Sequence, residues 1–289
     1  VTLLDRLRGN PLTHNVIDRL AGSARVSRIW VKTASEHQGL LFVTAAFMFF
    51  MMGVMIGPMY GFIDEAMVGL MDSLPEVLLA LFGGGDMGTP EGWYQVESFG
   101  MMAPLAVMVV TVSIGARALA GEEENRTMGL LLANPVKRST IIYQKTFAMA
   151  LYGLAVGFST FAGVAVGSLL GGLGMDVGNI AATSLLVTLV GLVFGAFALA
   201  LSAATGRVNV AVYGTVGVAL ILFVLNALLP FNDRLVGYAK VSPFYYYLTS
   251  DPLMNGMSWS HGAVLTALTI ILIVLSVVLF QRRDLRQSG

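Results

Sequence analysis

The residue types that carry out enzymatic chemistry are sparse in this sequence. Cysteine is absent, which excludes disulfides, thiolate metal sites and cysteine nucleophiles. His14, His37 and His261 are scattered along the chain, and no pair of carboxylates falls within one apolar segment. Acid–base catalysis needs such groups to converge on one substrate. The sequence therefore argues against an enzyme.

The sequence also lacks two common means of using an energy source. It contains no Gly-x-x-x-x-Gly-Lys-Ser/Thr loop to hold phosphates. The interiors of its apolar segments carry no ionisable residue of the kind on which proton- or sodium-driven carriers rely, since Arg117 and Lys145 lie near segment ends. If ATP drives this protein, a partner must hydrolyse it, and we expect this chain itself to bind no cofactor.

Four methionines share one face of the first apolar segment, with Met51 beside them: Met48, Met52, Met55 and Met59. Thioethers bind Cu(I), but neither a cysteine nor a nearby histidine completes such a site. We favour flexible side chains that pack or that line a translocation path for varied apolar cargo. Copper binding is the minor alternative.

The composition predicts an all-α polytopic membrane protein. Of the 289 residues, 56% are hydrophobic and only 12% are charged, against about 25% charged in soluble domains. A spanning helix needs about 20 mostly apolar residues. Runs of this length predict a single transmembrane domain over 1–289 with six spans, near 40–60, 99–119, 142–172, 180–205, 209–229 and 260–281.

The first apolar run begins only at Leu40 and is longer than the apolar region of a secretory signal, so we expect it to remain in the mature protein. In the third span, glycines recur every four residues and allow close helix contact. They are Gly153, Gly157, Gly163, Gly167 and Gly171. Packing within one subunit is favoured over a seam between two subunits.

The distribution of charge predicts the orientation. All but two of the 17 Lys and Arg residues lie before the first span, around the 2–3 connection, in the 4–5 turn or after the sixth span; the exceptions are Arg234 and Lys240. The loop at 61–98 carries acidic residues and no basic one. Because cytoplasmic segments retain Lys and Arg, both termini are expected in the cytoplasm, and 61–98 and 230–259 are expected outside.

Segments outside the spans carry further patterns. Residues 1–38 combine an apolar stripe with clustered basic residues, which fits either a cytoplasmic amphipathic helix in the headgroup region or a basic flank that sets topology. The 61–98 loop has helical apolar spacing, which predicts short amphipathic helices on the outer leaflet. The aromatic stretch within 230–259 predicts a re-entrant connection that closes the outward exit.

The segment at 121–134 carries both charge and an apolar face. Three glutamates open it, where they suit a helix N-terminus, and Asn134-Pro135 ends it. We predict a short amphipathic cytoplasmic helix. In an isolated monomer its apolar face would simply lie on the bilayer.

Two motifs resemble those of ABC-2 type transporter permeases. The first runs from Ala116 to Val136, with an acidic Gly-Glu-Glu, a basic residue, a threonine, leucine-rich positions and then Pro-Val. It departs at Asn125, where many relatives carry a charged residue or glycine. The second, in the outward connection before the last span, is Val241-Ser242-Pro243-Phe244-Tyr245-Tyr246-Tyr247 with Asp251-Pro252-Leu253-Met254-Asn255-Gly256.

The resemblance implies the membrane subunit of an ATP-binding-cassette exporter in a cytoplasmic membrane of prokaryotic type. Two permeases, identical or paralogous, would pair and bind two cytoplasmic ATPases that hold ATP and Mg²⁺, and no nucleic acid is implied. The coupling helix at 121–134 would dock on the ATPase through Glu122, Glu123, Glu124, Arg126, Thr127, Met128, Leu131 and Leu132. The outward gate would comprise Pro243, Phe244, Tyr246, Pro252, Asn255 and Gly256.

The spans offer no charged site, so an apolar or amphipathic cargo is favoured. The alternative function is a channel or a non-transporting membrane component, such as a sensor or an assembly factor. An ATPase that copurifies with the chain would distinguish the transporter from both.

Overall fold

The computed structural model describes residues 29–62, 86–132 and 137–283, with a few isolated residues between 63 and 85. Every regular element in this part of the chain is helical. The first helix is continuous from α3 (Ile29–Phe50) through a π-helical turn, η2 (Met51–Ile56), into α4 (Gly57–Met59) and η3 (Tyr60–Phe62). The second consists of α7 (Pro90–Tyr94), the π-helical η4 (Gln95–Phe99) and α8 (Met102–Arg117).

The remaining long helices are α11 (Arg138–Gly171), α12 (Val177–Thr205), α13 (Val208–Leu228) and α16 (Trp259–Arg282). Six helices in the described part are long and apolar enough to cross a membrane, as the sequence predicts. The first begins at Ile29 rather than near residue 40, because its exposed first turns tolerate the charged Lys32 and Glu36. Within the predicted N-terminal segment, residues 29–38 are therefore part of the first spanning helix, and residues 1–28 lie outside the described part.

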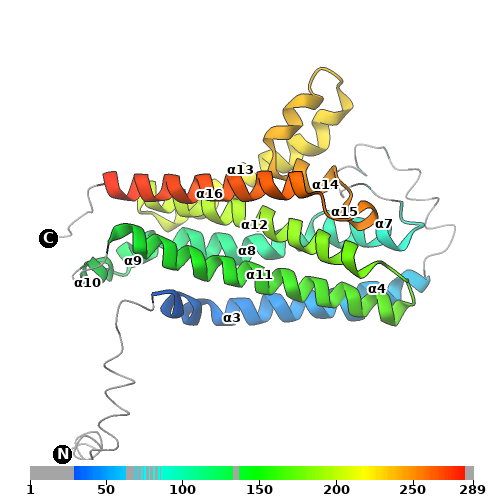
Figure 1. Cartoon of the computed structure of the whole chain (residues 1–289), viewed down its shortest axis with the longest axis horizontal. Helices are drawn as coiled ribbons and strands as arrows, with labels where there is room; N and C mark the ends of the chain where they lie inside the picture. Colours follow the sequence, from blue (N-terminus) through cyan, green and yellow to red (C-terminus); the bar gives the residue numbers. More distant parts are fainter. Residues whose placement is uncertain are drawn as a thin grey trace, which may run out of the picture.

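The long helices run side by side, with α12 at the centre (Figure 1). Helix α12 contacts α8, α11, α13 and α16, while α3 packs against α11. Most side chains of α12 are buried, and they are mainly apolar, which is the pattern of a core helix rather than a lipid-facing one. The core therefore lies along α12, and α3, α13 and α16 expose wide apolar surfaces.

Glycines let the first helix, from α3 to α4, approach α11 backbone to backbone. A Cβ added at Gly57 would overlap the carbonyl oxygen of Gly167, and one added at Gly163 would lie 3.0 Å from the carbonyl oxygen of Phe49. The glycine stripe of α11 thus packs within one chain. Beside these glycines, the π-helical turn η2 interrupts the regular α-helical hydrogen bonds, which leaves carbonyls available to other donors. The Tyr94 hydroxyl donates to the Met52 carbonyl at 2.7 Å, and the Trp93 indole donates to that of Ile56 at 2.9 Å.

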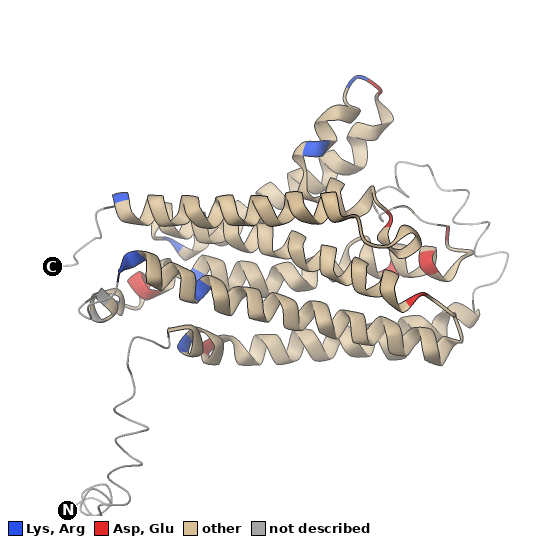
Figure 2. Ribbon diagram, in the orientation of Figure 1, with Lys and Arg blue, Asp and Glu red and all other residues tan. Residues whose placement is uncertain are grey.

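The two ends of the bundle differ. One, the α9 end, carries the short helices α9 (Ala120–Glu124) and α10 (Met128–Leu132), and basic side chains gather there (Figure 2). The other, the α14 end, carries α7, α14 (Pro243–Leu248) and α15 (Pro252–Asn255). Between α13 and α14, two short 3₁₀ helices, η5 (Leu229–Phe231) and η6 (Val236–Val241), form a hairpin that projects away from the bundle (Figure 1).

Candidate functional site

The segment predicted as one helix over 121–134 is instead two short helices. Helix α9 ends at Glu124, and α10 begins at Met128. Between them Arg126 takes a φ of 59°, in the left-handed region, which an α-helix cannot contain. Residues 133–136 lie outside the described part. The prediction of a single helix was therefore wrong in shape, because helical periodicity does not reveal a left-handed residue.

Glu122 lies inside the protein at the centre of an ion network. Its side chain is 5% exposed and lies 2.8 Å from the ammonium of Lys145 on α11, itself 3% exposed. The ammonium of Lys32 on α3 lies 3.2 Å from the same carboxylate, and the Thr127 hydroxyl also donates to it. Burial alone would raise the pKa of Glu122, but the charge and hydrogen bonds of its partners outweigh burial and lower the pKa to about 2. The carboxylate is therefore ionised at neutral pH.

Glu123 and Arg283 join α9 to the ends of two other helices. Arg283, which directly follows α16, forms an ion pair with Glu123. The same guanidinium donates to the carbonyls of Ser202 and Ala203 at 3.2 and 2.9 Å. These carbonyls lie in the last turn of α12, where a cation is favoured by the helix dipole. Glu123 thereby connects α9 to both α12 and α16.

Glu124 and the first residue of α9 complete the set of contacts. The Glu124 carboxylate accepts a hydrogen bond from the backbone N–H of Val208 at 3.0 Å, at the N-terminus of α13, where an anion is favoured. The N–H of Ala120 donates to the Ser202 hydroxyl at 2.9 Å. The three glutamates thus link α9 to α3, α11, α12, α13 and α16.

The rest of the predicted docking set is divided between the interior and a small exposed tip. Met128 is buried in a cluster with Ile29, Ile142 and Phe280, and Leu131 packs against that cluster. The side chain of Leu132 lies outside the described part. The tip consists of the exposed residues Asn125, Arg126 and Gly129.

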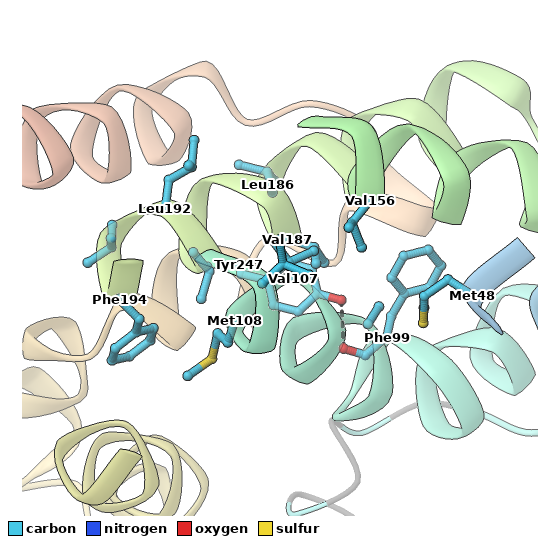
Figure 3. Close-up of a cluster of buried hydrophobic side chains, with 14 of the residues drawn as sticks. Met48, Phe99, Val107, Met108, Val156, Leu186, Val187, Leu192, Phe194 and Tyr247 are labelled. Atoms are coloured by element: carbon cyan, nitrogen blue, oxygen red, sulfur yellow. Dashed lines mark hydrogen bonds between the residues drawn. The ribbon is translucent and has the colours of Figure 1, made fainter. Parts of the chain in front are cut away.

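The predicted outward-gate residues come together at the α14 end. Pro243 occupies the first turn of α14, where its missing N–H costs nothing, and the Ser242 hydroxyl caps that helix. Phe244 is buried, with its ring 5.3 Å from those of Phe194 and Phe223. The Tyr247 hydroxyl donates to the Phe99 carbonyl at 2.7 Å (Figure 3).

Helix α15 is attached to the same end of the bundle. The Asn179 amide donates to the carbonyls of Leu253 and Met254 at 2.9 and 3.2 Å. The remaining predicted gate residues are Tyr246, Pro252, Asn255 and Gly256. The ring of Tyr246 meets that of His261 edge-on, and the Asn255 amide donates to the Ser250 carbonyl. Pro252 begins α15, and Gly256 ends it at a φ of 77°. We call α14 and α15 together the plug.

An apolar groove of about 530 Å³ runs between the antiparallel helices α8 and α13. Phe244 of the plug lines one end, and Arg117 lines the other. Its remaining lining is Gly100, Met101, Pro104, Leu105, Met108, Val109, Val112, Ser113, Val212, Val216, Ala219, Leu220 and Phe223. These residues were not predicted from the sequence, since their helical spacing is equally that of a lipid-facing stripe.

The methionine stripe of the first span does not line this groove. Met48 and Met52 are fully buried in the core, whereas Met55 and Met59 are exposed. The π-helical turn η2 contains Met52 and Met55 and has more residues per turn than an α-helix, so the four side chains no longer share one face. In the part of the chain that is described, no three His, Cys, Asp or Glu residues cluster in a way that could hold a metal.

Six apolar spanning helices and two polar ends define a multi-pass membrane protein. Residues 32–285 match the family described as ABC-2 family transporter protein. The chain therefore belongs to the ABC-2 transporter family and is the membrane subunit of an ABC transporter, a class that lacks the ATPase site and associates with an ABC ATPase. A comparison with curated proteins finds no match.

Proposed function

We propose that this chain is the permease half of an exporter in a prokaryotic cytoplasmic membrane. Two permeases, identical or paralogous, pair and bind two cytoplasmic ATPases, which hold the ATP and Mg²⁺. The cargo is apolar or amphipathic. The α9 end and both termini face the cytoplasm, and the plug faces outward.

The observation that carries this proposal is the way in which α9 is held. Its tip is exposed, while its glutamates bind Lys32 of α3, Lys145 of α11, Arg283 at the end of α16 and the first N–H of α13, and Ala120 binds Ser202 of α12. A force on the tip is therefore transmitted to all five. A surface helix resting on lipid would have no need of the buried ion pair between Glu122 and Lys145, because burying ions is costly unless they are paired.

Two further observations support the orientation and the state. Basic side chains gather at the α9 end, as cytoplasmic ends do (Figure 2). The groove is lined by Phe244 at the plug end, where that ring packs against Phe194 and Phe223. This arrangement fits a state closed to the outside. Release to the outside then requires α14 to leave these rings and to break the bond between Tyr247 and Phe99.

The experiment reverses the charge of the tip. Reversing an interfacial charge is expected to cost on the order of 2–5 kcal/mol, so Arg126→Glu should abolish copurification of the ATPase. The matched control is Arg207→Glu, which reverses another exposed charge, in the turn between α12 and α13. Undiminished copurification with Arg126→Glu, at wild-type membrane abundance, would show that the tip does not dock the ATPase.

A further inference from the structure

The hairpin at 229–241 exposes apolar side chains and cations together. It contains η5 and η6 and projects sideways from the bundle, across the direction of the long helices (Figure 1). Within the described residues, the side chains of Arg234 and Lys240 form no ion pair or hydrogen bond. The large apolar side chains that the hairpin exposes are Phe231, Leu235, Val236, Tyr238 and Val241. Water on all sides would leave this apolar surface uncovered, which the surfaces of soluble proteins avoid.

The hairpin lies at the depth of a membrane boundary. Helix α16 has 24 residues, about 36 Å at 1.5 Å per residue, which is slightly more than the roughly 30 Å hydrocarbon core of a bilayer. Its first residue, Trp259, is 78% exposed, and tryptophan and tyrosine are enriched where a bilayer meets water. The hairpin leaves the bundle level with the first turns of α16 (Figure 1). Its side chains, Tyr238 among them, are therefore at the level of the lipid headgroups.

The charges of the hairpin favour an anionic surface. Of the 17 Lys and Arg residues, Arg234 and Lys240 are the two that the charge distribution places outside. Asp233 is the acidic residue of the segment, so its two basic residues leave a net charge of +1. Long basic side chains can lay their stems on an apolar surface while their charges reach the headgroups. A surface that is both basic and apolar, at the level of the headgroups, is suited to bind an anionic leaflet.

A second copy of the chain is a poorer partner for the hairpin. Toward the same end of the bundle it could offer the exposed Glu97 and Asp176, and three carboxylates that line a pocket of about 260 Å³, those of Asp86, Glu91 and Asp251. A carboxylate pairs with a cation but leaves the apolar side chains uncovered, whereas a leaflet covers both. The pocket is smaller than the roughly 300–1,000 Å³ of sites for drug-sized ligands, so it cannot enclose the cations together with five large apolar side chains.

We propose that the hairpin binds the outer leaflet and anchors the plug to it. Its apolar side chains lie among the outermost parts of the acyl chains, and Arg234 and Lys240 bind the phosphates of anionic lipid. Ser242 alone separates η6 from α14, since it ends the first helix and caps the second. The anchor therefore fixes the first helix of the plug relative to the bilayer. Its assignment to the outer leaflet rests on the proposed orientation of the permease.

The test measures where the hairpin lies in a bilayer. Because the chain has no cysteine, Val236→Cys places a single fluorophore on the hairpin, at an exposed side chain. The permease alone is reconstituted in phosphatidylcholine vesicles. Three quenchers are compared: aqueous iodide, a lipid with a nitroxide on its acyl chain near the headgroup, and a lipid with the nitroxide midway along the chain. The same fluorophore at Asn255→Cys, exposed on α15, and at Phe158→Cys, exposed on α11, provides the controls.

The nitroxide near the headgroup should quench the fluorophore at position 236 more than the nitroxide midway along the chain does. This order should reverse at position 158, and iodide should be the strongest quencher at position 255. Phosphatidylglycerol and phosphatidylcholine that carry the same nitroxide near the headgroup are then compared. Phosphatidylglycerol should quench position 236 at about fivefold lower mole fraction, which corresponds to the roughly 1 kcal/mol by which one basic charge attracts an anionic lipid.

Charge variants of the labelled protein test the role of the two cations. Arg234→Gln combined with Lys240→Gln should abolish the preference for phosphatidylglycerol, whereas Arg234→Lys combined with Lys240→Arg should retain it. Arg207→Gln removes an exposed charge at the α9 end and should leave the preference unchanged.

Several results would overturn the proposal. Quenching of position 236 by iodide alone would place the hairpin in water, and stronger quenching by the nitroxide midway along the chain would place it in the hydrocarbon core. Protection from all three quenchers would show that a second copy of the chain covers it. Equal quenching by the two lipids, or a preference that survives removal of both cations, would show that they do not select anionic lipid. The assay contains no ATPase, so its failure is distinct from a failure of ATPase docking.

Discussion

The buried pair of Glu122 and Lys145 allows a quantitative prediction. Glu122→Gln leaves the Lys145 ammonium, 3% exposed, without its charged partner. Breaking a buried ion pair in this way costs about 3–5 kcal/mol. At about 2–4 °C per kcal/mol for a large domain, the apparent melting temperature of the purified protein should fall by roughly 6–20 °C.

Two comparison variants test the physical reason. Glu36→Gln removes the other carboxylate near Lys32, an exposed pair at 3.6 Å, and should cost under about 1 kcal/mol. Replacing both charges, as Glu122→Leu with Lys145→Met, removes the desolvation cost together with the attraction and should restore most of the stability. Melting is followed by size-exclusion chromatography of heated samples. If Glu122→Gln melts like Glu36→Gln, the network does not hold α9 in place.

Three further predictions concern other parts of the structure. The folded-state pKa of Glu122, about 2, lies below its ordinary value of 4.5, so its contribution to stability is complete above about pH 5 and is lost as the pH falls toward 2. The test compares how the melting temperatures of the wild type and of Glu122→Leu/Lys145→Met depend on acid pH. Identical pH dependence in the two proteins would contradict this prediction. Gly57→Ala should destabilise the protein by about 1–3 kcal/mol or more, since the added Cβ would overlap the backbone of α11. Gly39→Ala has open space around it and should be neutral or stabilising. Equal melting temperatures for the two variants would contradict the close packing of the two helices. Tyr247→Phe removes the hydrogen bond between the plug and the Phe99 carbonyl, which contributes about 1 kcal/mol, and should increase leakage of a small fluorescent dye from proteoliposomes. Leakage equal to that of the wild type would refute this prediction.

The spans and the position of the short helices α9 and α10 could be predicted from the sequence, because each depends on a local pattern. Apolar runs reveal spanning helices, and the acidic motif before a leucine-rich stretch marks the segment at 121–134. The partner of Glu122 could not be predicted, since Lys145 lies 23 positions away and meets it only after α9 folds back on α11. In the sequence, Lys145 looks like one of the basic residues that commonly flank a transmembrane helix.

Other features depend on packing that hydropathy does not report. The left-handed Arg126 divides the predicted helix, and the π-helical turn that contains Met52 and Met55 disrupts the methionine stripe, so that Met48 and Met52 are buried while Met55 and Met59 are exposed. The groove between α8 and α13 has the same sequence pattern as a surface that faces lipid. Only the positions of the two helices and of Phe244 distinguish it.

Site-directed photo-crosslinking tests the central claim, that the tip between α9 and α10 contacts an ATPase, most directly. Asn125→Cys, in the naturally cysteine-free chain, places a benzophenone reagent on the tip, and Gly237→Cys places it on the exposed hairpin near the plug. We expect a covalent adduct with an ABC ATPase from position 125 and none from position 237. Labelling of position 125 by a membrane-impermeant reagent outside the cell, without an ATPase adduct, would contradict the account.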